Sequence, residues 1–251
     1  MFHKIIFWNL FKNLIFLKKN SKYFRRNIEI IISKRILIIL FILYIKIQLC
    51  ICNNSVIIIK IKKGLNSIIY KDFKKYLLEV YINDINETNI ETSYNFTEED
   101  NTVKIILNSQ INNCNKMFMN CQNIYDINFS NFDGSNITHL SETFKNCNQL
   151  KSIDLSDWDI SQVININNLF QNCNSLTSIE FPNFKNSNIT SMNSVFRYCK
   201  NLRSLNFSKF DTSKVTNMGY MFSDCGTLTS LDLSFFDTSN LIECHIVNYI
   251  I

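Results

Sequence analysis

Five cysteines recur at a fixed interval, and their thiols could form disulfides or bind a metal. Cys121, Cys147, Cys173, Cys199 and Cys225 stand 26 residues apart. Stacked repeats would bring neighbouring Cα atoms to about 5 Å, a separation that a disulfide tolerates. However, five thiols in one row cannot all pair, and no C-x-x-C motif or nearby histidine completes a zinc site. The pattern therefore predicts a structural ladder of buried, reduced cysteines, with Cys114 and Cys121 as the pair to expect if any disulfide forms.

Other catalytic chemistry has little support in the sequence. The histidines, His3, His139 and His245, have no matching nucleophile or carboxylate motif beside them. The four glycines are too dispersed to form a phosphate-binding loop. We therefore predict that the protein is not an enzyme and that it uses no catalytic residue, no metal and no cofactor.

A set of polar residues alternates with apolar ones after each cysteine, and we predict that it forms one exposed strand face. Because successive side chains of a strand point to opposite sides, these residues would share a surface that binds a protein or glycoconjugate partner. The alternative is a face that is merely solvated. If it binds a partner, Asp154→Ala should weaken binding and leave stability nearly unchanged. The candidate residues are Asp126, Asn128, Ser152, Asp154, Ser156, Ser178, Glu180, Ser204, Asn206, Ser230 and Asp232.

The elements that would position these residues follow from the 26-residue period. Phe118, Phe144, Phe170, Phe196 and Phe222 keep the same interval, and apolar residues recur 3, 6, 8 and 11 positions after each cysteine. A period of 20–29 residues with an L-x-x-L-x-L core indicates leucine-rich repeats. Val215, Met218 and Phe222 have helical spacing, and Thr212 or Ser213 could cap that helix. The predicted fold class is therefore α/β, a leucine-rich-repeat solenoid of five strand–turn–helix coils over residues 114–243.

The stretch "NLRSLNFSKFDTSKVTNMGYMFSDCGTLTSLDLSFFDTSN" over residues 201–240 resembles the BspA-like leucine-rich-repeat surface proteins. The resemblance covers residues 112–241. It implies a location on the cell surface and a role in adhesion to other proteins. From residue 242 the sequence "IECHIVNYII" departs from the repeat pattern, so we expect residues 244–251 to be a divergent tail, and a truncated reading frame would give the same pattern.

Two further segments precede the repeats. Residues 53–113 alternate β-branched and polar residues, which predicts a small β-rich segment that caps the first coil. Residues 1–52 form a basic leader followed by the apolar run "RILIILFILYIKIQLCIC". A basic flank before an apolar stretch is typical of a signal peptide or a signal anchor. We therefore expect an N-terminal hydrophobic helix at residues 36–52 that attaches the protein to a membrane if it is not cleaved.

The charge distribution argues against nucleic-acid binding. Ten of the 26 Lys and Arg lie in residues 1–52, which leaves 16 basic and 20 acidic residues in the remainder. That net charge of −4 offers no concentrated positive field for phosphates. The sequence thus favours a secreted or cell-surface protein that acts in adhesion or protein recognition. The alternatives are an intracellular repeat scaffold, with the apolar run an artefact or a core helix, and a fragment of a larger repeat protein.

Overall fold

The computed structural model describes residues 54–108, 111–134, 137–182, 188–208, 210–229 and 231–242. The chain divides into two units, Met1–Cys52 and Asn53–Ile251, and every described residue belongs to the second. The expected leader, the apolar helix at residues 36–52 and the tail at 244–251 lie outside the described residues. Within the described ranges, no helix has both the length and the apolar character needed to span a membrane.

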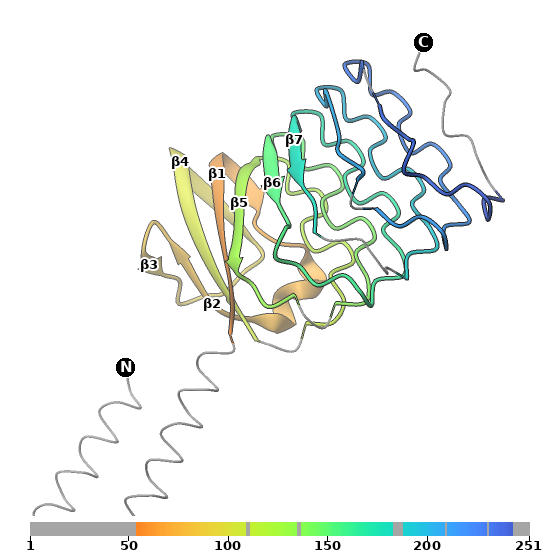
Figure 1. The fold of residues 1–251 in the computed structure, drawn as a ribbon. Coiled ribbons are helices and arrows are strands. Elements are labelled where there is room, and N and C mark those ends of the chain that lie inside the picture. The colour runs from red at the N-terminus through yellow and green to blue at the C-terminus, as the bar shows by residue number, and fades with distance from the viewer. Residues whose placement is uncertain are drawn as a thin grey trace, which may run out of the picture. The chain divides into compact units, whose positions relative to one another are not determined.

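A five-stranded sheet with antiparallel pairing occupies the first part of this unit (Figure 1). Its order is β3-β2-β4-β1-β5, with strands β1 (Ser55–Ser67), β2 (Leu77–Ile82), β3 (Ile85–Asn86), β4 (Ser93–Leu107) and β5 (Ile124–Asn131). A short 3-10 helix, η1 (Lys71–Tyr76), precedes β2. Alternating residues of β1, such as Ile57, Ile59 and Ile61, are fully buried, and Val103 and Ile105 of β4 face the same core. Period-two alternation of β-branched residues therefore produces strands with one buried side.

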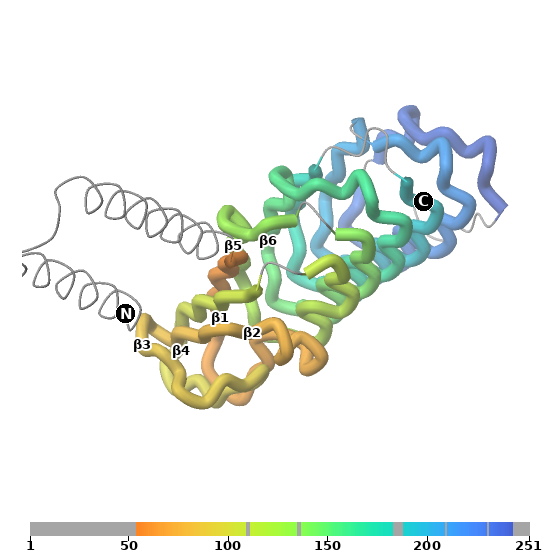
Figure 2. The backbone as a smooth tube through the Cα atoms, turned by 90° about the horizontal axis from the view of Figure 1, so that it is seen from below, coloured from red at the N-terminus to blue at the C-terminus, as the bar shows by residue number. Residues whose placement is uncertain are grey.

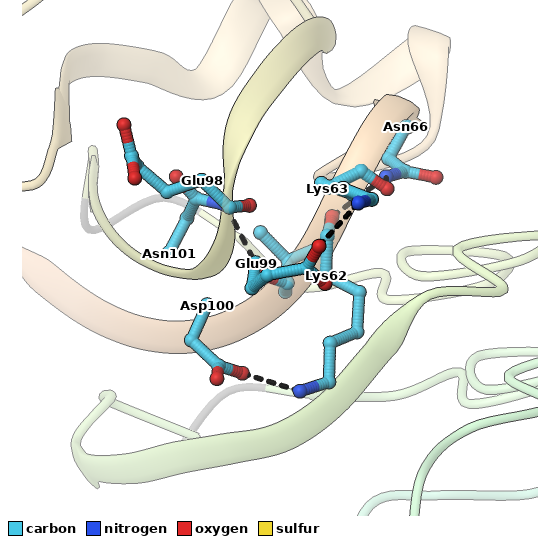
Figure 3. A network of polar contacts seen from close by, with 8 residues as sticks. Lys62, Lys63, Asn66, Glu98, Glu99, Asp100 and Asn101 are labelled. Carbon is cyan, nitrogen blue, oxygen red and sulfur yellow. Dashed lines mark hydrogen bonds and ion pairs between the residues drawn. The ribbon is translucent and has the colours of Figure 1, made fainter.

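Polar side chains fix an irregularity in β1, where the pairing with β4 shifts between Lys62 and Gly64 (Figure 3). Gly64 has a φ of 110°, and the Asn66 side chain donates to the carbonyl of Lys62 over 2.9 Å. Asn101 is buried and donates to the carbonyl of Glu98 over 2.8 Å. Beside the bulge, Lys62 Nζ lies 2.5 Å from Asp100 Oδ1. The side-chain amides of Asn66 and Asn101 thus bond backbone carbonyls at the point where the strand pairing shifts.

Strand β1 also joins this sheet to the repeats, because it pairs with β5, the strand of the first repeat. Ile59 lies opposite Val103 on one side and opposite Ile127 on the other. Beyond β5 come two three-residue strands, β6 (Ser152–Asp154) and β7 (Ser178–Glu180), which pair in parallel. The segment 53–113 thus supplies four strands, one of which covers the first repeat strand.

Successive repeats lie side by side, and we call a set of residues 26 apart a row (Figure 2). One row is a chain of parallel bridges from Asn113 through His139, Asn165 and Ser191 to Asn217. Another is the phenylalanine row, whose rings stack within 7° of parallel at centroid distances of 5.3–5.9 Å. The stacked rings run through the hydrophobic core from Phe118 to Phe222.

The segments predicted to be helices are chains of tight turns instead. We call residues 114–121 and the equivalent stretches 140–147, 166–173, 192–199 and 218–225 the turn segments. Among the described residues η1 is the sole helix, and no α-helix occurs. The prediction of an α/β leucine-rich-repeat solenoid built from strand–turn–helix coils is therefore wrong. Thr212 and Ser213 cap no helix, since Thr212 Oγ1 donates to the carbonyl of Asp237 and Ser213 belongs to a turn with Asp211.

Two left-handed residues in each turn segment explain why no helix forms. Positive φ values between 56° and 66° recur at the third and seventh positions, for example at Asn168 and Asn172 in the third repeat. Such residues cannot continue a right-handed helix. The amides also pair outward: Phe118 N–H donates to the Thr143 carbonyl over 2.8 Å, and Phe144 N–H donates to the Leu169 carbonyl over 2.9 Å. Backbone bonding between repeats thus replaces bonding within a helix.

Candidate functional site

The predicted partner-binding residues lie on the strand side of the repeats, and most of them are exposed. Asp126 is half-buried, and Ser230 lies outside the described residues. The candidate residues between Asp126 and Glu180 lie in strands β5, β6 and β7, except Ser156, which lies in the turn after β6. The later candidates that the structure describes lie outside regular strands. The exposed members are Asn128, Ser152, Asp154, Ser156, Ser178, Glu180, Ser204, Asn206 and Asp232.

A groove of about 290 Å³ opens on this side, between the first and second repeats. Three carboxylates, those of Asp126, Asp154 and Asp157, line it together with the polar side chains of β5. The full lining is Asp126, Ile127, Asn128, Phe129, Ser130, Asp154, Asp157 and Trp158. The groove thus combines negative charge with an aromatic wall.

The three carboxylates have different surroundings. Asp126 lies 3.5 Å from Lys60 Nζ of β1, which offsets part of its charge. Asp154 accepts a hydrogen bond from the Ser156 backbone N–H over 2.9 Å. Asp157 is exposed, and among the described residues it makes no hydrogen bond or ion pair. Asp157 is therefore the carboxylate of this groove with the greatest freedom to bind a cation.

Aromatic packing behind the groove holds its aromatic wall in place. Trp158 is only 4% exposed, and its ring meets that of Phe129 edge-on at 4.9 Å and that of Phe132 at 5.2 Å. Such contacts add to the stability that comes from burial alone. The Trp158 Nε1–H is buried and has no acceptor among the described residues. The wall of the groove is thus held in place without a ligand.

Four of the predicted binding residues have a structural role that sequence reasoning missed. Asn128, Asp154, Asn206 and Asp232 each accept a hydrogen bond of 2.8–2.9 Å from the backbone N–H of the serine two residues later. Such turns let a short Asn or Asp side chain close its own backbone. The hydroxyl and backbone N–H of Ser156 lower the pKa of Asp154, and those of Ser234 lower the pKa of Asp232.

The third repeat lacks this turn, and its sequence explains why. Its equivalent residues are Glu180 and Pro182. Proline has no N–H to donate, so an acceptor at position 180 would have no amide to bind. A glutamate stands there instead of Asp or Asn. The recurring Asx-x-Ser spacing could have been found from the sequence, and it marks turns rather than a binding surface.

The cysteine row lies in the core, on the turn segments. Its members Cys121, Cys147, Cys173, Cys199 and Cys225 are all buried and have free thiols, as does Cys114, which lies outside the row. Four of the thiols donate to the carbonyl of the phenylalanine 29 residues earlier, at sulfur–oxygen distances of 3.0–3.2 Å. Burial raises the pKa of Cys114 to about 12 and that of Cys225 to about 11, and it raises the pKa of Cys173 well above the usual value. The row therefore serves packing, because the reactive thiolate form is suppressed.

The described residues contain no group of three His, Cys, Asp or Glu side chains placed to hold a metal ion. His139 is exposed in the bridge row, and its Nδ1 lies 2.7 Å from Thr138 Oγ1. His3 and His245 lie outside the described ranges. Among the described residues no carboxylate lies within hydrogen-bond distance of His139 to orient its ring.

Comparisons with other proteins place the repeats within a longer region of similarity. No curated protein and no solved structure has significant similarity to the chain. One family model matches residues 88–180 and again residues 175–247, so it covers strand β4 as well as the repeats. These matches cover well over half of the sequence, and the chain belongs to the family described as "Mycoplasma protein of unknown function, DUF285".

Proposed function

We propose that the protein is a non-enzymatic recognition protein that binds a partner protein through the groove on the strand side of its repeats. The observation that carries this proposal is the groove itself, which Asp126, Asp154 and Asp157 line together with Trp158. Exposed Ser and Asp residues elsewhere on the face are poor anchors, because binding hot spots are enriched in Trp, Tyr and Arg.

The chemistry of the groove favours a Lys or Arg side chain of the partner. A cationic head can pair with the carboxylate of Asp157, which has no other partner among the described residues. The apolar stem of such a side chain can lie against Phe129 and Trp158. Asp154 would contribute charge while its Ser156 bond keeps it in place.

The sequence resemblance to the BspA-like surface proteins supports a location outside the cell. On this proposal residues 36–52 act as a signal peptide or anchor, and the protein works in adhesion. Protease added to intact cells that express the chain with a C-terminal tag should destroy the tag and spare cytosolic proteins. A tag that is degraded only after the cells are permeabilised would favour an intracellular scaffold.

Selection from a random peptide library tests the groove even though the partner is unidentified. The full chain would select peptides, and each enriched peptide would be measured against Asp157→Asn and against Asp126→Asn. Asp224→Asn is a matched control, since Asp224 is an exposed aspartate of a turn segment. We expect enriched Lys or Arg residues and binding about tenfold weaker to Asp157→Asn.

The control should bind like the wild type. Peptides without basic residues, or peptides that bind all variants equally, would contradict the proposed groove. Unfolding midpoints of the variants must match that of the wild type, so that lost binding is not lost folding.

A further inference from the structure

Arg197 lies against the rings of Tyr198 and Tyr220 on the fourth and fifth turn segments. None of these three residues lines the groove. The guanidinium carbon of Arg197 lies 4.8 Å from the ring centroid of Tyr198 and 5.2 Å from that of Tyr220. One terminal nitrogen, Nη2, donates to the Tyr198 hydroxyl over 3.2 Å. Stacking of this kind limits the motion of a guanidinium before any ligand arrives.

The charge of Arg197 has no carboxylate partner in the part of the chain that the structure describes. None of the ion pairs there includes it, and its buried Nε has no hydrogen-bond acceptor. The same repeats also hold Lys200 and Asp224, which are exposed and have opposite signs. A restrained guanidinium with donors to spare is suited to bind a carboxylate through two parallel hydrogen bonds.

The backbone under the two tyrosines adds an independent reason to look for function here. Tyr198 and Tyr220 have φ values of 64° and 56°, in the left-handed region. The row of Tyr198 uses asparagine in its first three repeats, at Asn120, Asn146 and Asn172, and the row of Tyr220 holds no other aromatic residue. Asparagine tolerates this conformation, so Tyr198 departs from the pattern of its row, whereas the row of Tyr220 also holds the long side chains of Lys116 and Glu142. Two aromatic rings at left-handed positions thus lie beside one arginine.

We propose that Arg197, Tyr198 and Tyr220 form a second interaction surface, which binds an acidic segment of a partner protein. The guanidinium pairs with an Asp or Glu carboxylate of that segment. The tyrosine rings cover the aliphatic stem of that Asp or Glu side chain. Tyr220, which is 41% exposed, supplies most of the contact area. Arginine and tyrosine are the residue types that concentrate binding energy at protein interfaces. This proposal does not depend on the acidic groove.

A fluorescein-labelled peptide of alternating Glu and Gly is a suitable probe, with a Lys–Gly peptide of equal length as its counterpart. Fluorescence anisotropy would measure binding to the full chain, to Arg197→Lys and to Tyr220→Asn. Arg203→Lys is the matched control, because Arg203 is an exposed arginine that follows the fourth turn segment. We expect Arg197→Lys to bind the acidic peptide about tenfold more weakly, since lysine cannot form the paired hydrogen bonds.

Further readouts make the result decisive. The side-chain Nε–Hε resonance of Arg197 should shift when the acidic peptide is added and stay unchanged with the Lys–Gly peptide. Binding should persist in Asp157→Asn, which separates this surface from the groove.

Equal binding of the acidic peptide to Arg197→Lys and wild type would overturn the proposal. So would displacement of the peptide by an equal concentration of inorganic phosphate, which would mark a simple anion site. Self-association of the unliganded chain that disappears in Arg197→Lys would assign the surface to a second copy and would also overturn it.

Discussion

The thiol of Cys173 donates a hydrogen bond to the backbone carbonyl of Phe144, 3.0 Å away in the preceding repeat. The same contact recurs at Cys147, Cys199 and Cys225, so each junction between neighbouring phenylalanines also carries a thiol bond. The cysteines therefore act as buried donors that hold adjacent turn segments together.

Alkylation of the native protein should be very slow at these thiols. Burial raises the pKa of Cys225 to about 11 from 9.0, so at pH 8 its thiolate fraction is about 100-fold lower than that of a free thiol. Iodoacetamide labelling followed by peptide mass spectrometry should find Cys225 modified slowly, and Cys147 and Cys173 modified only after unfolding. A Thr229→Cys variant, with an exposed new thiol, provides the positive control. Rapid native labelling of Cys173 would contradict the buried row.

Substitution of Asn172 distinguishes the observed turn from the helix expected from the sequence. Asn172 has a φ of 63°, and its Nδ2 donates to Asn146 Oδ1 over 2.7 Å. Alanine is strained at positive φ and glycine is not, so Asn172→Ala should lower the free energy of unfolding by about 1 kcal/mol more than Asn172→Gly. In a helix the order would be reversed. Urea unfolding of the two variants decides between these orders.

Removal of one ring from the phenylalanine stack should be costly. Phe170 is fully buried, with ring centroids 5.3 Å from Phe144 and 5.9 Å from Phe196. Phe170→Ala should reduce the free energy of unfolding by about 3–5 kcal/mol, because it leaves a cavity in a packed core. Phe235→Ala, at a site that is 52% exposed, is the control and should change stability by less than about 0.5 kcal/mol. Similar unfolding curves for both variants would argue against the stack.

Asp154 should contribute to folding even in the absence of a partner. Asp154→Ala removes the acceptor of the Ser156 N–H and should cost about 0.5–1.5 kcal/mol, whereas Asp154→Asn keeps an acceptor oxygen and should cost less. Chemical denaturation of both variants measures the difference. An alanine variant as stable as the wild type would return Asp154 to the role of a freely exposed surface residue.

The aspartates of these turns also predict acid sensitivity. The pKa of Asp154 is lowered by the Ser156 hydroxyl and N–H, and the pKa of Asp159 is lowered mainly by the Ser161 backbone N–H. Because the folded pKa values lie below the ordinary value of 3.8, the contribution is present above that pH and is lost as the pH falls through the folded values. A variant with Asn at both positions should lose less stability than the wild type when the pH falls below 3.8. Parallel losses would exclude these two turns as the cause.

The apolar rows could be predicted from the sequence, and the turn segments could not. The 26-residue spacing identified the residues that contact one another, as the ring stack from Phe118 to Phe222 shows. Intervals of three and four residues, as between Met218, Met221 and Cys225, suit a helix, but a chain of tight turns buries the same residues. The asparagines at left-handed positions carried the missing signal. Asn is common throughout this chain, so its enrichment at particular turn positions did not stand out.

The candidate site was only partly predictable. Asp126 and Asp154 follow from strand alternation, and both line the groove. The positions of Asp157 and Trp158 in the groove depend on how the first two repeats pack together, and the sequence of a single repeat does not specify that packing. Likewise, the contact of Arg197 with Tyr220 joins residues 23 apart, three short of the row spacing of 26, so the period alone does not pair them.

The backbone bonds between turn segments all run in one direction. At each junction between the described repeats, amides such as those of Phe118, Phe144 and Phe170 donate to carbonyls 25 residues later, and no backbone bond between two described turn segments runs the other way. Aligned peptide groups add their dipoles as they do in a helix, with the positive end on the side to which the N–H groups point. The stacked turn segments therefore carry an aligned peptide dipole, which is partly opposed outside them by amides such as those of Thr190 and Thr216, since these donate to carbonyls 26 residues earlier. Lys116 in the first turn segment and Asp224 in the last have the signs that this dipole favours.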